Sequence, residues 1–535
     1  MKRLLVAALA AFLWGGGFLA ATDEPPPQGP TLVLPQVTLD IQDLSIENVQ
    51  AMLPSAREAP ITQSQILLPS TPAFTVEAPA RRLAVEGSDP LGGAPAAQRP
   101  LATQTTLGAG LQNRVIGRLN VATVGGSARA NLSFAHETAD GISGKAAGSG
   151  FDTRDDTIGG SISGKLGPVD GSFQGSYAEK SVGLQGQSPF ISRLGRTLDG
   201  TAGASVQPLE WLTVDSTVTG AADTLTLAAG SPTQASEYRA GAHAGATART
   251  GVFTAGVSGD FGFRSAAMIA PGAQEQVQRI RTGLSLGLDF PGSILLEGTA
   301  AWFLNTQSLS LFPFSLHLGG VTFSIFSFDV SAGFKVVPYD QEDILALSPY
   351  LLPVTLSDDN GWFVDGAVQL ALPGDLSLKV GASFMRSAEM PDISSTPNGM
   401  GLFPVFQKPA NRLTGDASLR WSVAPGITLD ARWKREFLDK PLFVPLDQVT
   451  AEAIAMESTG AFGGQAAVTW LVDPAFSWAP VIDVGGFVRL SEAAQLHLDF
   501  YDVLWFLLNG TRYGPSISPY VEPGFRAVAS IRLSF

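Results

Sequence analysis

Residues 521–535 (VEPGFRAVASIRLSF) alternate between apolar and polar side chains. Every second residue from Phe525 to Phe535 is apolar, and the residues between them are polar except Val528. A period of two predicts a β-strand with one apolar face and one polar face. The alternation continues to the final residue, where chains usually fray, so we expect another part of the protein to hold this strand end in place.

The same period begins near residue 113 and fills most of the chain. In 413–434 two alternating runs flank the turn Ala424-Pro425-Gly426, and in 362–385 two more flank Pro373-Gly374-Asp375. Tight turns about 40 residues apart predict pairs of long strands joined alternately by short turns and longer loops. The wide gap between Pro291 and Pro373 predicts a further, hidden pair. The predicted tight turns are at Pro168, Pro208, Gly251, Pro291, Pro373, Pro425 and Pro474.

Composition indicates which face meets water. Hydrophobic residues make up 45% of the chain and charged residues only 15%, against about 25% charged in soluble domains. No apolar run after residue 21 is long enough for a membrane helix. A closed barrel is the remaining way to span lipid, because every backbone polar group must then be paired. We therefore predict an all-β fold, a transmembrane antiparallel barrel of about 16–20 strands over 113–535.

In such a barrel the polar faces line the lumen and the apolar faces meet lipid. Trp362, Trp421 and Trp433 are then expected at the membrane interfaces. A soluble propeller with blades of about 40 residues is a competing interpretation, but no blade signature repeats. A β-sandwich would need many separate cores for so many two-faced strands. The predicted strands do not add up to an even number, as a closed barrel of this kind requires. The stretch 440–480, which includes the helix-like 450–458, gives an odd number of strands.

The first 112 residues differ from the rest. Residues 1–21 have a basic start, an apolar stretch and small residues, which predicts a secretory signal peptide. Residues 22–112 are rich in proline and are expected to be a largely extended periplasmic segment. Within it, 45–53 is a possible short helix and 31–39 is strand-like. The expected location is the bacterial outer membrane, with outer-membrane lipid as a partner.

Charge and cysteine content exclude several classes of function. The formal net charge is −14, and loss of Lys2 and Arg3 with the signal peptide makes the mature chain still more acidic. We therefore expect no nucleic-acid partner. The chain has no cysteine, which excludes disulfides, thiolate metal sites and a lipid-modified cysteine.

Three short motifs suggest chemistry but fit structural roles better. Gly283-Leu284-Ser285-Leu286-Gly287 matches a hydrolase nucleophile pattern, yet it lies in the middle of a predicted strand instead of at a strand–helix turn. His497 and Asp499 share one strand face and are expected to form a structural pair. The sequence Asp358-Asp359-Asn360-Gly361 lacks the ligand spacing of a calcium loop and is interpreted as a solvated turn. We expect no enzymatic activity, cofactor or metal.

The C-terminal strand resembles known bacterial proteins. Phe535, with Ile531 and Leu533, resembles the C-terminal signal of outer-membrane barrels, which implies recognition by the barrel-assembly machinery. Pro523-Gly524-Phe525-Arg526 resembles the lead-in to the last strand of TonB-dependent receptors. The stretch Thr31, Leu32, Val33 and Leu34 is similar to their TonB box, which implies a periplasmic partner for 22–112.

TonB-dependent receptors also have a 22-strand barrel and a globular plug, and the Pro-rich segment here is too short for a full plug. The resemblance therefore implies a plugless relative or an ordinary channel with a similar ending.

The function we predict is an outer-membrane channel, porin-like, for small hydrophilic solutes. One alternative is plugless, TonB-dependent uptake, coupled to a periplasmic or inner-membrane partner through the N-terminal segment. A second is a structural or adhesive barrel with a filled lumen. The predicted lumen-lining residues are Arg420, Asp430, Arg432, Lys434, Asp499, Arg526 and Arg532.

Overall fold

The fold is described from a computed structural model of the chain. The predicted signal peptide, the Pro-rich segment up to residue 100, the possible helix 45–53 and the TonB-box-like Thr31–Leu34 lie outside the described residues. Those described are 101–123, 128–142, 145, 148, 150–228, 233–268, 274–290, 293–307, 309–322, 325–439, 446–472, 480–508, 520 and 524–535.

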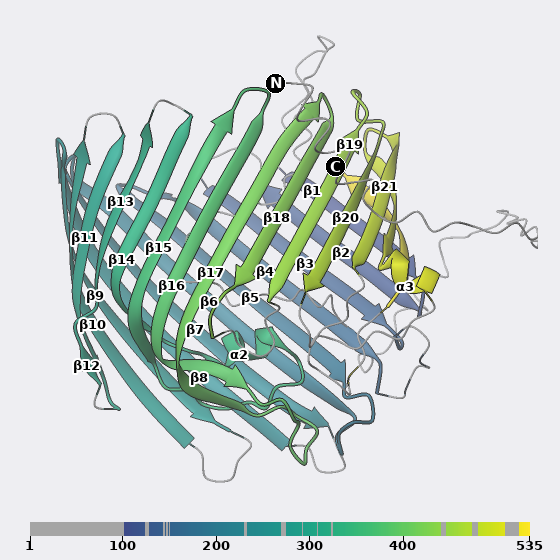
Figure 1. Cartoon of the computed structure of the whole chain (residues 1–535), viewed down its shortest axis with the longest axis horizontal. Helices are drawn as coiled ribbons and strands as arrows, with labels where there is room; N and C mark the ends of the chain where they lie inside the picture. The colour runs from purple at the N-terminus through teal and green to yellow at the C-terminus, as the bar shows by residue number, and fades with distance from the viewer. Residues whose placement is uncertain are drawn as a thin grey trace, which may run out of the picture. The chain divides into compact units, whose positions relative to one another are not determined.

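The described residues form one closed antiparallel barrel of 22 strands (Figure 1). Each strand pairs with its neighbours in the chain, and β1 pairs with β23 to close the ring. The first strands are β1 (Leu101–Gly110), β2 (Arg114–Thr123), β3 (Ala128–Ala139), β4 (Thr153–Leu166), β5 (Val169–Gly183), β6 (Ser192–Leu209), β7 (Leu212–Ala228), β8 (Thr233–Thr250), β9 (Phe253–Ala267), β10 (Gln274–Phe290) and β11 (Ile294–Asn305). The others are β13 (Phe314–Thr322), β14 (Phe326–Val337), β15 (Asp359–Leu372), β16 (Leu376–Ile393), β17 (Val405–Ala424), β18 (Ile427–Glu436), β19 (Asp447–Met456), β20 (Phe462–Val472), β21 (Val481–Ser491), β22 (Ala494–Tyr501) and β23 (Arg526–Ser534).

Three short elements complete the description. The two-residue β12 (Ser310–Leu311) precedes β13 in the chain, and both pair with β11. We therefore do not count β12 as a separate barrel strand. The helices are α2 (Gln341–Leu347) and α3 (Val503–Leu508). No helix among the described residues is long and apolar enough to cross a membrane.

The fold class is confirmed, but the predicted number of strands was too low. β1 lies in residues that the sequence pattern assigned to the N-terminal segment, so the barrel starts at Leu101 and not at 113. The stretch 450–458 looked helical because it is rich in alanine and glutamate, yet most of it belongs to β19, which pairs with β18 and β20. Pairing with neighbouring strands thus overrides local helix propensity, and the strand missed at 440–480 restores an even count.

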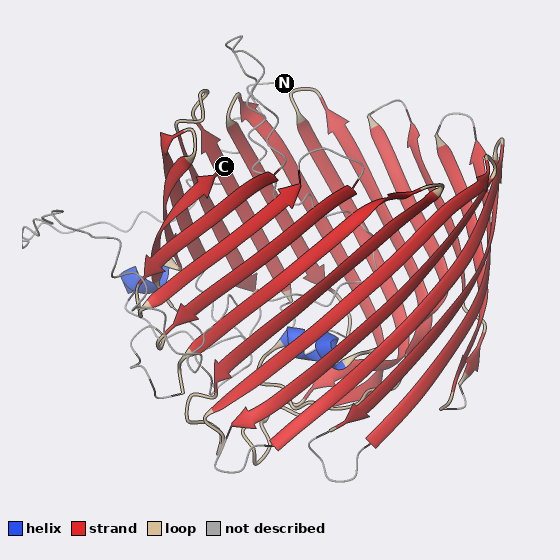
Figure 2. Cartoon of the chain, turned by 180° about the vertical axis from the view of Figure 1, so that it is seen from behind, coloured by secondary structure: helices blue, strands red, loops and turns tan. Residues whose placement is uncertain are grey.

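The two ends of the barrel differ in the length of their connections (Figure 2). At one end, the turn end, short turns join the strands, and β1 begins and β23 ends there. At the other, the loop end, most connections are longer. Predicted turns at Pro168, Gly251, Pro373 and Pro425 fall between paired strands at the turn end. Pro208 lies just before the β6–β7 turn, while Pro291 and Pro474 lie outside the described residues.

The pairing register separates outward from inward side chains. Leu284 and Leu286 of β10 are 62% and 69% exposed, whereas Val277 of the same strand, on the opposite face, is fully buried. Trp362, Trp421 and Trp433 lie in register with outward-facing residues of neighbouring strands. The outer surface is therefore the apolar one, as expected of a barrel in lipid.

Candidate functional site

The interior of the barrel is the candidate site, and one group of predicted lumen residues lies together on β17 and β18. Arg420, Asp430, Arg432 and Lys434 share a strand face with Glu436, which is 1% exposed. Asp430 forms salt bridges with both arginines, with Oδ2 3.2 Å from Nε of Arg420 and Oδ1 3.4 Å from Nε of Arg432. Glu436 likewise pairs with Lys434 and Arg412, so each of these two acids is shared between two cations.

The remaining predicted lumen residues lie near the closure of the barrel. Asp499 of β22 and Arg526 and Arg532 of β23 occupy the face opposite the outward Leu496 and Leu498. The guanidinium of Arg526 lies 4.9 Å from the ring centre of Tyr501. Nε2 of His497 lies 3.3 Å from Oε1 of Gln495. The sequence led us to expect a pair with Asp499, whereas this contact is with Gln495.

The C-terminal signal residues lie on the outward face. Ile531 and Leu533 pair with Leu107 and Thr105 of β1. The backbone N–H of Phe535 donates to the carbonyl of Thr103 over 2.8 Å, and the N–H of Thr103 donates back over 3.0 Å. The strand end is thus held by pairing with β1, as the alternation in the sequence led us to expect.

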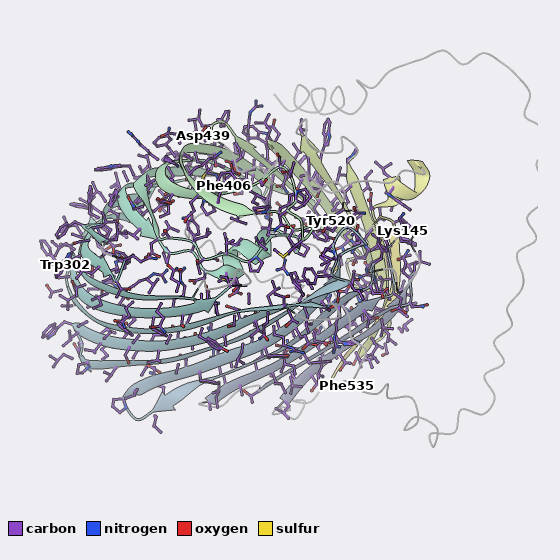
Figure 3. The ribbon with its side chains drawn as sticks, turned by 90° about the horizontal axis from the view of Figure 1, so that it is seen from below. Lys145, Trp302, Phe406, Asp439, Tyr520 and Phe535 are labelled. Carbon is purple, nitrogen blue, oxygen red and sulfur yellow. The ribbon has the colours of Figure 1, made fainter. Side chains whose placement is uncertain are left out.

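A long connection enters the barrel from the loop end. Residues 338–358, between β14 and β15, carry α2 and are called the inner segment. They lie within the ring of strands in the view along the barrel, in which Tyr520 is also inside and Trp302 is at the periphery (Figure 3). Pro338 ends the preceding strand because it lacks the N–H that strand pairing requires.

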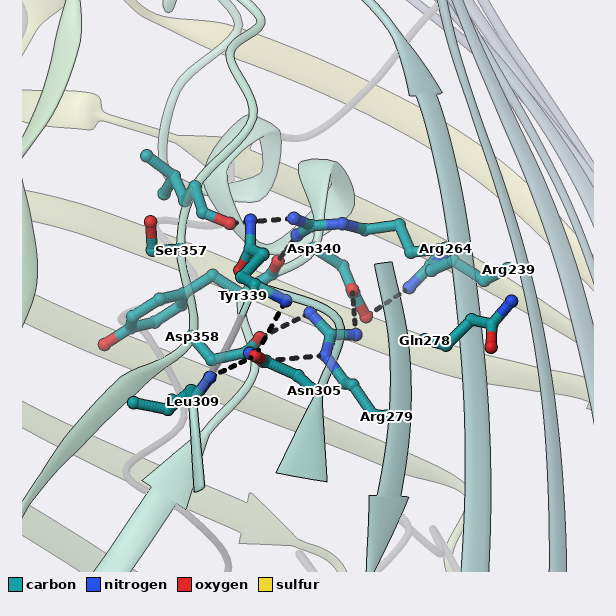
Figure 4. A network of polar contacts seen from close by, with 12 residues as sticks. Arg239, Arg264, Gln278, Arg279, Asn305, Leu309, Tyr339, Asp340, Ser357 and Asp358 are labelled. Carbon is teal, nitrogen blue, oxygen red and sulfur yellow. Dashed lines mark hydrogen bonds and ion pairs between the residues drawn. The ribbon is translucent and has the colours of Figure 1, made fainter. Parts of the chain in front are cut away.

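Inward polar side chains of three adjacent strands, β9, β10 and β11, hold the inner segment (Figure 4). Arg279 of β10 donates from Nε to Oδ2 of Asp358 over 3.0 Å and makes a second contact with Oδ1. Asn305 of β11 donates to the same carboxylate over 2.9 Å. Arg264 of β9 donates to the backbone carbonyls of Tyr339 and Leu356 over 2.6 and 2.9 Å. Both ends of the inner segment are therefore fixed to the same wall.

A fourth tether comes from β8. Arg239 donates to Asp340 over 2.9 Å, to Glu342 over 2.8 Å and to Asp223 of β7 over 2.6 Å. The N–H of Gln341 donates to Glu237 over 3.1 Å, at the start of α2. Charge-assisted hydrogen bonds of this kind are stronger than neutral ones, and they also fix direction.

Apolar packing joins the inner segment to other loops. Tyr350 stacks on Tyr520 at 3.8 Å between ring centres, and the Tyr520 hydroxyl donates to the carbonyl of Gly401 over 2.6 Å. A single bridge pairs Leu351 with Phe403. We call this cluster the loop core, and its buried members are Ile344, Leu351, Leu356, Ile393, Phe403, Val405 and Tyr520.

The loop core excludes water from the Tyr520 side chain, which is 1% exposed. Burial raises the pKa of the Tyr520 hydroxyl to about 12. The direction follows from the cost of placing a charge where water is scarce.

The interpretation of Asp358-Asp359-Asn360-Gly361 as a solvated turn was wrong. Asp358 is 3% exposed and Asp359 is fully buried, and both carboxylates bond to neighbouring strands or loops. Ser285 of the hydrolase-like motif lies in the middle of β10 and pairs with Gly256 and Thr299, as expected of a strand residue. Among the described residues no three His, Asp or Glu side chains are grouped as a metal ion would need.

Comparison with solved structures identifies the fold. The ferric enterobactin receptor of Pseudomonas aeruginosa superposes with a TM-score of 0.61 at 11% identity, over 82% of each chain. The FrpB iron transporter of Neisseria meningitidis gives 0.62 at 9% identity, again over 82% of each chain. FpvA of Pseudomonas aeruginosa, bound to a pyoverdine–iron complex, gives 0.59 at 11% identity over 81% of this chain and 72% of its own. This is the fold of the TonB-dependent outer-membrane receptors.

Sequence comparisons add no closer relationship. No protein-family description matches the chain, and no curated protein matches it. The identities of 9–11% mean that the likeness extends to the fold alone. The expected class and location, a bacterial outer-membrane β-barrel, are confirmed.

Sequence reasoning missed Arg239, Arg264, Arg279 and their partners in the inner segment. The arginines do stand at inward positions of alternating strands, so their direction was readable from the pattern. The acids Asp340, Glu342 and Asp358 lie in a long connection whose return into the barrel leaves no periodic signal. Contact between these acids and the arginines depends on the three-dimensional path of the loop.

Proposed function

We propose that this protein passes small hydrophilic solutes across the outer membrane through its barrel, with the inner segment acting as a gate at the loop end. The observation that carries this proposal is the combination of a polar inner wall with a loop that enters the barrel and is tied there by Arg239, Arg264 and Arg279. A structural barrel needs no such loop, whereas a regulated passage does.

The contacts between the inner segment and the barrel wall are of a kind that would let the segment move as a unit. The tethers are ion pairs and hydrogen bonds, which water replaces when the segment leaves the wall. The strands that carry the arginines keep their backbone pairing in either state, since no backbone bond of the barrel ladder involves the inner segment apart from its ends. Opening therefore costs loop contacts and leaves the barrel intact.

Conductance in planar bilayers tests this function. We expect the refolded full-length protein to pass little current, and a variant with residues 341–356 replaced by a short Gly-Ser linker to form steady open channels. The double variant Arg264→Gln and Arg279→Gln should open intermittently. Arg386→Gln, a charge change on the outward face of β16, is the matched control and should behave as the native protein does.

The opposite results would overturn the proposal. If the linker variant keeps the heat-resistant mobility of a folded barrel in gels but passes no current, the lumen is filled by something other than the inner segment. That outcome would favour the structural or adhesive alternative.

A second candidate, energised uptake, is supported by the likeness to TonB-dependent receptors and by the box-like Thr31–Leu34. Here a periplasmic or inner-membrane partner would act on the N-terminal segment. Deletion of residues 22–99, which leaves β1 in place, should abolish uptake that depends on the proton gradient but should leave channel conductance unchanged. We propose no catalytic role for the barrel.

A further inference from the structure

A cavity in the barrel wall lies directly against the inner segment. Its volume is about 380 Å³, and it is lined by residues of β9, β10, β11, β13, β14 and β15, most of them on the inward face. Pro338, at the start of the inner segment, and Arg279, which holds Asp358, both line it. The volume falls within the range of about 300–1,000 Å³ that is usual for small-molecule sites.

The cavity has more positive than negative charge. Its ionisable lining residues are Arg279, Arg281, Lys335 and Asp260. Arg279 is neutralised by Asp358, and Asp260 contacts Nδ1 of His243 at 2.6 Å. Two cations, Arg281 and Lys335, therefore remain without a salt bridge to any described residue, in a protein whose net charge is −14.

The charges of Asp365 and Asp359 act on Lys335, but neither carboxylate forms a salt bridge with it. Asp359 accepts hydrogen bonds from the backbone of Glu389 and from Ser387, and Asp365 accepts one from Ser383. A half-buried ammonium group that forms no salt bridge costs free energy, which a bound anion would offset.

Two aromatic rings supply an apolar wall beside these cations. Phe303 and Phe363 are 6% and 9% exposed and face inward from β11 and β15. The Lys335 ammonium lies 4.4 Å from the centre of the Phe363 ring. Thr299 and Ser315 add hydroxyl groups, which are 2.7 Å apart.

We propose that this cavity is a binding site for a small organic anion with a flat apolar body, such as an aromatic carboxylate. The carboxylate would contact Arg281 and Lys335, and the ring would lie against Phe303 and Phe363. This inference rests on the proposed function, because it names the class of solute that the gated barrel would take. An aromatic carboxylate here would also lie next to the Arg279–Asp358 tether of the gate.

Binding of benzoate to the detergent-solubilised full-length protein tests the site, with neutral benzamide as the isosteric probe. We expect benzoate to bind with a dissociation constant below about 10 mM and benzamide to bind at least about tenfold more weakly, because only the anion gains charge-assisted hydrogen bonds. Lys335→Met and Arg281→Gln should each weaken benzoate binding by about tenfold. Lys379→Gln, which removes an inward cation of β16 outside the cavity, is the matched control and should change nothing.

Equal binding of benzoate and benzamide would overturn the proposal, and so would unchanged benzoate binding in both cavity variants. Absence of benzoate binding to the native protein would also overturn it. Conductance of the linker variant is measured separately, with a chloride salt and without benzoate. A conducting barrel without benzoate binding therefore contradicts the site alone, whereas a non-conducting linker variant contradicts the proposed gate.

Discussion

At the scale of single residues, the most informative side chain is Arg264, which is 1% exposed inside the barrel. Arginine is almost never buried unless it is paired. Here the guanidinium donates to two backbone carbonyls of the inner segment and lies 3.2 Å from Glu275. The alternation of β9 places this residue on the inward face, but sequence reasoning did not single it out, because its partners lie in a loop that returns from far along the chain.

Replacing Arg264 with methionine should loosen the inner segment. The carbonyls of Tyr339 and Leu356 would lose their donor, at a cost of about 2 kcal/mol in the free energy of closing the segment. Amide hydrogen exchange of residues 341–344 should therefore quicken, while exchange in β10 stays unchanged. Equal protection of α2 in the variant and the native protein would show that Arg264 does not hold the segment.

At the scale of elements, a set of outward-facing ion pairs on β3 to β6 marks the edge of the apolar belt, by which we mean the band of apolar side chains on the outer surface of the barrel. His136 lies 2.6 Å from Asp156, and Arg196 lies 2.6 Å from Glu179. These residues are near the loop end of their strands, and the next outward residue of β3 towards the turn end is Phe134. The alternation of the sequence predicted the two faces of each strand, but it did not distinguish outward charges above the lipid from inward ones.

A charged side chain in the middle of the apolar belt should lower the free energy of unfolding. The adjacent, inward-facing position in the same strand provides a control. Leu286→Arg places a guanidinium in hydrocarbon and should lower the free energy of unfolding by about 2–4 kcal/mol. Ser285→Arg, one residue away on the inward face, should cost less than about 1 kcal/mol. Urea titration of the two variants in lipid vesicles measures both values. Similar costs at the two positions would contradict the assignment of the faces.

The turn between β19 and β20 should weaken in acid. Hydrogen bonds from Thr459 and Ser458 lower the pKa of Glu457 to about 2, from an ordinary value of 4.5. The ionised carboxylate therefore stabilises the turn above pH 4.5, and this contribution is lost as the pH falls from 4.5 towards 2. Amide exchange of Thr459 should quicken across that window, and Glu457→Gln should remove the dependence.

An amide with a non-titrating acceptor is the control for the acid effect. The N–H of Ala493, in the turn between β21 and β22, donates to the Ser491 hydroxyl over 3.3 Å. Its exchange should change with pH only through the intrinsic chemistry of exchange. If Thr459 and Ala493 follow the same profile, Glu457 does not stabilise its turn in this way.

At the scale of the whole barrel, the sequence predicted the architecture and most of the strands. The class follows from alternation and composition because a lipid-facing strand must be apolar on every second residue. The strand number was underestimated where residues such as Leu101–Gly110 and Asp447–Met456 carry a weak or helix-like pattern. The interior assembly was not predictable, since Tyr520, Phe403 and Leu351 are brought together only by closure of the ring.

Closure between β1 and β23 leaves little room for added atoms. A side-chain carbon at Gly110 would lie 2.3 Å from the carbonyl oxygen of Ala527, whereas one at Gly117 would meet nothing closer than 3.9 Å. Gly110→Ala should therefore lower the free energy of unfolding by about 1–3 kcal/mol through overpacking. Gly117→Ala should have little effect. The temperature at which the folded band disappears in gels measures both, and an unshifted Gly110→Ala band would contradict the tight fit.

The pairing of β1 with β23 also has a consequence for biogenesis. Seven residue pairs, from Gln104–Ser534 to Gly110–Val528, join two segments that leave the ribosome at widely separated times. Until both have arrived, the growing sheet has two bare edges that attract other chains. Closure of the ring therefore awaits the last-made segment, and a chain that ended before β23 would keep both edges bare.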